Sequence, residues 1–481
     1  MPGLTKVPPV LAPPLPKQQP LLPTELLLHI FNLTYRRNPA WDLAPNGQLP
    51  RFARVCRSWL PAARMALYSV LYLSREDEEH GPPLDWTCGA LKRALRENPA
   101  LASLVLEVHF SNSEDCATAM ATSDVAKILC LCPNVRRVVL LGWSNYRLGY
   151  LRRALEGLHS LEHLLISPYP ISGSRSDPFC HLPDLFRMLP HWPRLRTLLV
   201  DRDGLGWDPD SPSIYGEDAE KLPQAERDAL RLTCAFPIPK GACAHLERVS
   251  IMSSLGDRHV AALARMAPNL RALTLPQAGG LSMISLRPAL RTWAETLEVL
   301  HLNVADDSDF VFGVSVPGDS ERCWALDDAL ACLPRLRELT TKTSVVHPAA
   351  FCKGFEALEE LALFEVQQSE LAPLRFAVNK TLPSLRTLQL AMQDRSYPNP
   401  SCELACVNRG IQFSDGLTCG TLTRLNDFCT KRQLPDDLGQ ATFDGLENAV
   451  EYKAWRDRNR DNGEGIPWLD ETFADSDVDD F

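Results

Sequence analysis

The sequence has no run of about 18 or more apolar residues, the length that a membrane-spanning helix needs. Its start also lacks a positively charged segment followed by an unbroken apolar stretch, so a secretory signal is not expected. Both absences predict a cytoplasmic or nuclear protein with no membrane partner.

Positive charge is in deficit across the 481 residues. The chain has 50 Lys and Arg against 60 Asp and Glu, which gives a formal net charge of -10. Nucleic-acid binding needs clustered Lys and Arg to neutralise phosphates, so we expect no nucleic-acid partner. Residues 461–481 contain eight acidic residues and no Lys or Arg. The acidity therefore describes this tail more than any binding surface.

The sequence motifs that carry catalysis are missing. There is no phosphate-binding glycine loop, no His-Glu-x-x-His zinc site and no Gly-x-Ser-x-Gly nucleophile turn. The segment that starts at Asp201 resembles the opening of a calcium loop, but Leu205 and Pro212 occupy positions that need oxygen ligands. We expect no metal, no cofactor and no enzymatic activity. A hidden catalytic site in the insertion 201–242 is the remaining enzymatic alternative.

Cysteine is not scarce, but its 15 copies lack the spacing of a zinc site. Most stand singly, so we expect them to be small buried apolar side chains.

Proline is abundant, with 39 copies, and seven of them fall in the first 20 residues. Such a segment forms neither a helix nor a central strand, so residues 1–20 are expected to be a disordered, Pro-rich lead-in. The alternative is that Pro13 to Pro16 serve as a ligand for a domain with an aromatic groove.

Two apolar stripes with helical spacing follow the Pro-rich segment. The first stripe consists of Leu22, Leu26, Leu27, Ile30 and Phe31. Pro23 suits the first turn of a helix, and Glu25 complements the positive end of its dipole. The second stripe consists of Phe52, Val55, Cys56, Trp59 and Ala63. Pro61 is expected to end one helix and to open another over residues 61–69.

These stripes carry the motifs Leu-Pro-x-Glu-Leu from Leu22 and Val-Cys-Arg-x-Trp from Val55, which resemble an F-box. The resemblance implies a helical module over residues 21–75 that docks on the Skp adaptor subunit of a cullin-RING ubiquitin ligase. It also implies the partner-binding residues Leu22, Pro23, Leu26, Ile30, Phe31, Val55, Cys56 and Trp59. The polar stretch between the stripes is longer than the usual linker of the family. An ordinary helical hairpin is the alternative, since it explains buried Leu and Trp equally well.

A hexamer of the form Leu-x-x-Leu-x-Leu then recurs ten times, with other apolar residues allowed at its three anchors. The copies begin at residues 105, 135, 161, 195, 246, 270, 297, 336, 358 and 385. The pattern resembles leucine-rich repeats of the longer kind, in which a short strand is followed by a helix. Residues 76–415 are therefore predicted to form an α/β solenoid, or horseshoe, whose anchors share one core. One copy departs from the pattern by ending in Thr341.

Two further features lie inside the repeats. From the second copy onward, the residue after the first anchor alternates between basic and acidic, as in Arg136, Glu162, Arg196, Glu247, Arg271, Glu298, Arg337, Glu359 and Arg386. Stacking at the strand spacing would place opposite charges side by side, although recurrence by composition is the alternative. The concave face is expected to carry side chains of mixed chemistry, namely His163, Arg248, Ser250, Thr274, His301, Glu360 and Gln389.

The remaining segments are two insertions and the C-terminal extension. The insertions 201–242 and 303–323 either project to bind partners or are disordered decoration. Near the end of the repeats we expect a last helix and a short strand within 403–413. The extension 416–481 is expected to contain a helix near Leu422 to Lys431 and a disordered acidic tail, with docking of a basic partner as the alternative.

The predicted fold is thus α/β, with an N-terminal helical F-box followed by a leucine-rich-repeat solenoid. The resemblance implies a substrate receptor of an SCF-type ligase that binds the Skp adaptor and, through it, cullin. The repeats would hold a protein substrate that the sequence does not identify, and the receptor would act by proximity. The alternative is a repeat interaction scaffold with no role in ubiquitination.

Overall fold

The computed structural model describes most of the chain between Leu22 and Ser414. The described residues are 22–36, 51–74, 84–111, 119–143, 147–167, 178–201, 205–206, 238–252, 255–278, 281, 283–304, 326–343, 345–392 and 400–414. The Pro-rich segment 1–20, nearly all of the two insertions and the extension 416–481 lie outside these residues. None of the helices in the described part is long and apolar enough to cross a bilayer.

A single sheet of twelve parallel strands runs through the described chain, and its strand order follows the sequence. Its strands are β1 (Val70–Ser74), β2 (Glu107–Ser111), β3 (Arg137–Leu141), β4 (His163–Ser167), β6 (Thr197–Val200), β8 (Arg248–Ile251), β9 (Ala272–Ala278), β10 (Val299–Val304), β11 (Glu338–Lys342), β12 (Glu360–Val366), β13 (Thr387–Met392) and β14 (Gln412–Ser414). A small second sheet pairs β5 (Cys180–His181) with β7 (Leu205–Gly206). Sequential parallel order is the topology of a solenoid, as expected.

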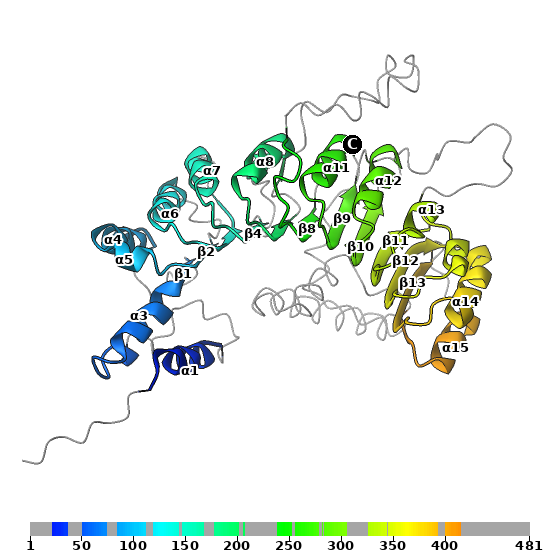
Figure 1. Cartoon of the computed structure of the whole chain (residues 1–481), viewed down its shortest axis with the longest axis horizontal. Coiled ribbons are helices and arrows are strands. Elements are labelled where there is room, and N and C mark those ends of the chain that lie inside the picture. Colours follow the sequence, from blue (N-terminus) through cyan, green and yellow to red (C-terminus); the bar gives the residue numbers. More distant parts are fainter. Residues whose placement is uncertain are drawn as a thin grey trace, which may run out of the picture.

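Within the described residues, helices join most of the successive strands and form a second layer. They are α4 (Leu84–Glu97), α5 (Pro99–Ala102), α6 (Ala119–Leu131), α7 (Leu148–Glu156), α8 (Leu182–Met188), α11 (Asp257–Met266), α12 (Met283–Thr292), α13 (Asp327–Leu330), α14 (Leu371–Lys380) and α15 (Pro400–Asn408), with the 3-10 helices η3 (Leu189–His191), η5 (Pro348–Lys353) and η6 (Gln368–Glu370). Figure 1 shows these helices along the outer side of an arc and the strands along its inner side. The inner face of the sheet is therefore not covered by this helix layer.

The repeat anchors explain this arrangement. In each copy, the strand starts two residues after the first anchor, so the second and third anchors point to the same face of the sheet. In the third copy, Leu161, Leu164 and Ile166 are all buried, and they belong to one core that runs through the whole solenoid. The residues between the anchors point to the opposite, concave face.

The solenoid starts earlier than expected, because β1 (Val70–Ser74) lies inside the segment 21–75 that was assigned to the helical module. Leu71 and Leu73 pair with the anchors Val108 and Phe110 of β2 and are buried. The first anchor of this repeat is Tyr68, which lies at the end of helix α3 (Leu60–Ser69), so its sequence pattern is masked by that of the helix. At the other end, α15 and β14 confirm the expected last helix and short strand.

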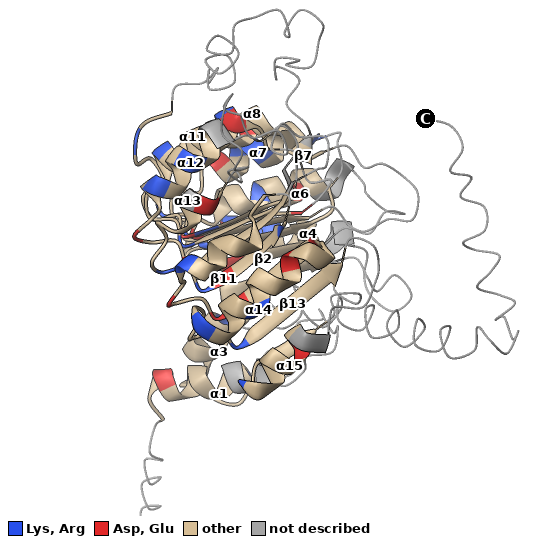
Figure 2. Ribbon diagram, turned by 90° about the vertical axis from the view of Figure 1, so that its right-hand side faces the viewer, with Lys and Arg blue, Asp and Glu red and all other residues tan. Residues whose placement is uncertain are grey.

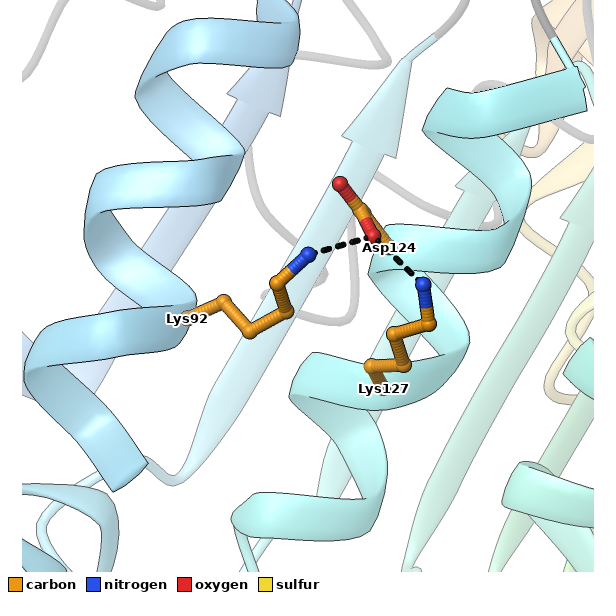
Figure 3. A network of polar contacts seen from close by, with 3 residues as sticks. All are labelled: Lys92, Asp124 and Lys127. Atoms are coloured by element: carbon orange, nitrogen blue, oxygen red, sulfur yellow. Dashed lines mark hydrogen bonds and ion pairs between the residues drawn. The ribbon is translucent and has the colours of Figure 1, made fainter. Parts of the chain in front are cut away.

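Helices α4 and α6 are joined by one buried carboxylate (Figure 3). Asp124 on α6 accepts hydrogen bonds from Lys92 on α4, at 2.7 Å, and from Lys127 on α6, at 3.1 Å. Burial by itself would raise the pKa of Asp124, but the two lysines outweigh it and lower the pKa. The carboxylate thus stays ionised where the helices pack.

The alternating charges form a continuous ladder along the sheet. From Arg136 onward, the backbone N–H of each ladder residue donates to the carbonyl of the preceding one, as Glu162 does to Arg136 at 2.7 Å. Their side chains meet in ion pairs, namely Arg136–Glu162, Arg196–Glu247, Arg271–Glu298, Arg337–Glu359 and Arg386–Glu359, at 3.1–3.9 Å. Basic and acidic segments lie interspersed along the left-hand edge of the ribbon in Figure 2. The predicted ladder is confirmed.

Thr341 stands in the core where the other copies of the hexamer have an apolar anchor. It is fully buried, and its hydroxyl Oγ1 has no hydrogen-bond partner within the described part of the chain. A buried hydroxyl without a partner keeps its desolvation cost, so this position weakens the core.

The ladder predicts the effect of charge reversal. Arg271→Glu places a third carboxylate between Glu247 and Glu298, so the melting temperature should fall, by an amount equivalent to less than about 1 kcal/mol because the pairs are half exposed. The double variant Arg271→Glu, Glu298→Arg should recover only part of the loss, since Glu247 still faces a glutamate. Calorimetry at low and at 1 M salt measures both effects, which salt should suppress. Equal melting temperatures for all three proteins at low salt would contradict a stabilising ladder.

Replacing the buried hydroxyl should stabilise the protein. Thr341→Val keeps the shape of the side chain and removes the unpaired hydroxyl, so the free energy of unfolding should rise by about 1 kcal/mol. Thr341→Ser is the matched control, because it keeps the hydroxyl and loses a methyl group, and it should destabilise. Denaturant unfolding compares the two; a less stable valine variant would mean that the hydroxyl is satisfied.

Candidate partner-binding surfaces

The N-terminal module consists of two packed helices, α1 (Thr24–Arg36) and α3 (Leu60–Ser69). Its small core contains Leu27, Phe31, Ala62 and Ala63. The ring of Phe31 stacks on Phe52 at 4.8 Å and lies 5.7 Å from the ring of Trp59. Phe31 is fully buried and Trp59 is partly buried, so these two of the expected partner-binding residues hold the module together.

The second apolar stripe is not one continuous helix. Residues 53–55 and 57–59 form turns, and a new helix starts at Leu60 with Pro61 in its first turn. Proline has no N–H, so the helical hydrogen bond from residue 61 to the carbonyl of Arg57 cannot form. The helix expected over 61–69 is confirmed, whereas the helical periodicity before it corresponds to turns that bring Phe52 and Trp59 onto Phe31.

Large apolar side chains remain on the surface of the same module. Leu26 and Ile30, four residues apart on α1, are 50% and 41% exposed, and Leu22 just before the helix is 46% exposed. Val55, in the turn that follows Phe52 in the second stripe, is 56% exposed. The neighbouring Pro23 and Cys56, also expected to bind a partner, are exposed as well. We call Leu22, Leu26, Ile30 and Val55 the exposed apolar set.

The module joins the solenoid without a linker. Helix α3 ends at Ser69 and β1 begins at Val70, while the carbonyl of Ser69 accepts a hydrogen bond from the N–H of Leu106 at 2.9 Å. Tyr68, at the end of α3, packs against the core of the solenoid. The position of α3 is thereby set by the first repeats.

The concave face carries two rows of side chains, one from each position between the anchors. The seven residues expected there all lie in these rows: His163, Arg248, Ser250, Thr274, His301, Glu360 and Gln389. Strand pairing places neighbouring members side by side, as with Ser250 and Thr274. Their mixed chemistry, expected from the sequence, is confirmed.

A polar cluster occupies the concave face over β1 to β4. The rings of Tyr72 and His109 lie 4.7 Å apart, and His109 Nε2 lies 3.4 Å from Glu107 Oε2. Arg137 contacts the same carboxylate at 3.6 Å and is paired in register with His163 on the next strand. Only His163 was expected on this face. Tyr72 lies on β1, which the sequence did not indicate as a strand, whereas Glu107, His109 and Arg137 lie between the anchors of the first two copies of the hexamer.

The charges in this cluster shift two pKa values. Burial lowers the pKa of His163, and the positive charge of Arg137 lowers it further. Burial would raise the pKa of Glu107, but its hydrogen bond with His109 and the charge of Arg137 outweigh burial and lower the pKa. The cluster therefore favours a neutral His163 beside an ionised Glu107.

The rest of the concave face changes character along the solenoid. Over β6 to β10 it contains a small buried apolar cluster of Leu199, Ala272 and Val299, with Leu165 packed against it. The polar residues Arg248, Ser250 and Thr274 lie on the same strands. Over β10 to β12 it is acidic, with Glu338 at 4.0 Å from His301 and Glu360 on the next strand. The face thus has a polar cluster over β1 to β4 and an acidic zone over β10 to β12, with a small buried apolar cluster between them.

The described part contains no group of three or more His, Cys, Asp and Glu placed to hold a metal ion. Its cysteines are free, and six of them are buried. Burial raises the pKa of Cys132, Cys180 and Cys243 to about 12, so these thiols stay protonated. They act as small apolar side chains, as expected. Cys56 is exposed, and its hydrogen bond with Ser58 lowers its pKa.

The polar cluster predicts a paired change in two pKa values. Arg137→Gln removes the positive charge that lowers both, so the pKa of His163 and that of Glu107 should rise together. Arg136→Gln is the matched control on the adjacent, more exposed position and should leave both nearly unchanged. NMR titration of carbon-13-labelled histidine and glutamate side chains measures them. Equal titration curves in the parent and the Arg137 variant would contradict the assigned electrostatics.

Known proteins share little sequence with this chain. No protein-family model and no curated protein matches the chain. Among solved structures, the leucine-rich repeat-containing protein LegL7 from Legionella pneumophila is 12% identical over 70% of this chain and 95% of its own, with a TM-score of 0.32. A protein from Bacteroides fragilis is 12% identical over 74% of this chain and 76% of its own, with a TM-score of 0.29. At such scores the description of the fold depends on the strand order and the repeats.

Proposed function

We propose that this protein is a substrate receptor of an SCF-type cullin-RING ubiquitin ligase. In this proposal, the exposed apolar set binds the Skp adaptor, and the adaptor connects the chain to cullin. The concave face of the solenoid holds the protein to be ubiquitinated. The observation that carries the proposal is the exposure of Leu26 and Ile30 on α1, and of Leu22 just before it, while the other face of this helix is packed in a core.

The free energy lost by leaving Leu26 and Ile30 exposed to water supports a docking role for α1. Burying an aliphatic side chain of this size contributes roughly 1.5–3 kcal/mol, and α1 leaves Leu26 and Ile30 largely in water. Leu27 and Phe31, on the same short helix, are fully packed. A neighbouring group of exposed apolar side chains is typical of a surface that a partner covers. The motifs that resemble an F-box place this group where the family binds its adaptor.

The direct junction between α3 and β1 suits a receptor that works by proximity. No flexible linker separates Ser69 from Val70, so a docked adaptor and a target on the concave face would keep a defined separation. The chain itself would perform no bond chemistry. Its contribution would be to raise the effective concentration of target lysines near the ubiquitin-charged enzyme.

The target would be a protein that matches two zones of the concave face. The polar cluster over β1 to β4 offers hydrogen-bonding groups, and the acidic zone near Glu338 favours basic side chains. The alternative function is a repeat scaffold that binds such a protein without any link to ubiquitination. Both functions share the solenoid and differ in the partner of α1.

Binding to the Skp adaptor separates the two functions. Leu26→Asp and Ile30→Asp put charges into the proposed interface and should each weaken capture of the purified adaptor at least about tenfold, since removing one buried aliphatic contact and burying a charge costs more than 1.4 kcal/mol. Phe376→Asp, at an equally exposed apolar position on α14, is the matched control and should bind like the parent.

Trp59→Ala would be a poor probe, because it removes part of the core of the module. Circular dichroism of each variant verifies that α1 and α3 stay folded. If the parent does not bind the adaptor, or if both aspartate variants bind as the parent does, the ligase role is overturned and the scaffold function is favoured.

A further inference from the structure

The outer surface of helix α7 carries an exposed tyrosine between two arginines. The side chains that α7 packs into the core are Leu148, Leu151, Ala154 and Leu155. Tyr150 lies on the opposite side of the helix and is 51% exposed. Arg147 comes three residues before it and Arg153 three residues after it, so the three side chains share one face. Their guanidinium carbons lie 5.5 and 5.3 Å from the centre of the tyrosine ring. Two positive groups thus flank an aromatic ring on the convex side of the solenoid.

Arg153 carries its charge on the surface. It is exposed, and its Nε donates to the carbonyl of Gly149 at 3.3 Å, but it forms no ion pair within the described residues. Glu156, the last residue of α7, is the only acidic residue of this helix. The arginines of α7 and Arg147 just before it therefore outnumber the acidic groups.

The helices on both sides of α7 add positive charge, because their carboxylates are shared by two cations each. Asp124 on α6 is held by two lysines. Asp184 on α8 lies 2.8 Å from Arg187 and 4.0 Å from Arg152 of α7. Figure 1 shows α6, α7 and α8 as successive helices along the outer side of the arc. The charged residues from α6 to α8, with Arg147, are Lys127, Arg147, Arg152, Arg153 and Arg187 against Asp124, Glu156 and Asp184.

This surface is locally basic in a chain whose formal net charge is -10. Arginine pairs with carboxylates through two parallel hydrogen bonds, and tyrosine and arginine are enriched among the residues that dominate protein interfaces. A nucleic acid is a poorer fit, because Asp124 and Asp184 lie among the cations and would repel phosphates. An acidic protein segment is therefore the ligand that the chemistry favours.

The spacing along the helix defines the ligand further. Six residues separate Arg147 from Arg153, so their Cα atoms are about 9 Å apart along the helix axis. In an extended segment, residues three apart are separated by roughly 10 Å. Two carboxylates at that spacing would reach both arginines, and an apolar side chain between them would cover the ring of Tyr150.

We propose that the surface formed by Arg147, Tyr150 and Arg153 binds an acidic segment of a second protein. Carboxylates of this segment pair with the two arginines, while an apolar side chain packs on the tyrosine ring. The surface lies on the convex helix layer, away from the concave face and from α1. It is thus a separate interaction site, and it stands or falls independently of the ligase role.

Fluorescence anisotropy with the full chain tests the site. The probe is a fluorescein-labelled peptide of sequence Glu-Glu-Leu-Glu-Glu-Leu-Glu-Glu, and the matched probe has Gln in place of every Glu. At low salt the parent should bind the acidic probe at least about tenfold more tightly than the neutral one, and 1 M salt should remove most of this difference.

Variants locate the binding. The double variant Arg147→Glu, Arg153→Glu should weaken binding of the acidic probe at least about tenfold, because two attractions become repulsions. The double variant Arg335→Glu, Arg375→Glu is the matched control: it changes the net charge equally at exposed positions outside these helices and should bind like the parent. Tyr150→Ala should weaken binding about threefold, whereas Tyr150→Phe keeps the ring and should not. Capture of the Skp adaptor should be the same for all four proteins and the parent, which separates this site from the ligase role.

Three outcomes would overturn the proposal. The first is equal affinity of the parent for the acidic and the neutral probe. The second is an equal loss in the two double variants, which would mean that overall charge and not this surface attracts the probe. The third is that an eight-nucleotide oligouridylate binds more tightly than the acidic probe and loses its binding in the Arg147 and Arg153 variant, because the ligand would then be a nucleic acid.

Discussion

The structure depends on the burial of repeat anchors that no single repeat can bury by itself. Each strand places two anchors on one face, and the adjoining repeats complete the cavity around them. Because the strands are parallel, each chain segment must cross back through a helix, and this requirement produces the outer layer seen in Figure 1. The ladder of alternating Arg and Glu lies where the chain enters each strand. Pairing the repeats in another order would place like charges side by side, which is unfavourable.

The same dependence on neighbours explains the behaviour of the two ends. At the first repeat, α3 runs directly into β1, so the helical module is part of the end of the solenoid rather than a separate body on a linker. At the other end, β14 is the last strand of the described sheet, and Phe413 on it is partly buried. The proposed adaptor site thus lies near the first repeat, and the concave face extends from there along the solenoid.

Much of this architecture could be predicted from the sequence because its signals are periodic. The hexamers beginning at Val105 and ending with that at Leu385 all form strands, and the alternating charges all stack. The first strand was missed because Tyr68 serves both as the end of a helix and as an anchor. The break before Pro61 was only partly anticipated, since apolar residues in turns can mimic helical spacing when they converge on one ring, here that of Phe31.

The sequence by itself determined the repeat, the parallel sheet that it requires, the charge ladder and the acidic end of the chain. Each of these follows from local pattern, because spacing alone decides which side chains share a face. Only the tertiary structure decided which apolar residues of α1 are core and which are surface. Leu26 and Phe31 belong to one stripe, and packing against α3 covers only Phe31. It likewise brought Tyr72, Glu107, Arg137 and His163 together, because strand pairing joins residues that are distant along the chain.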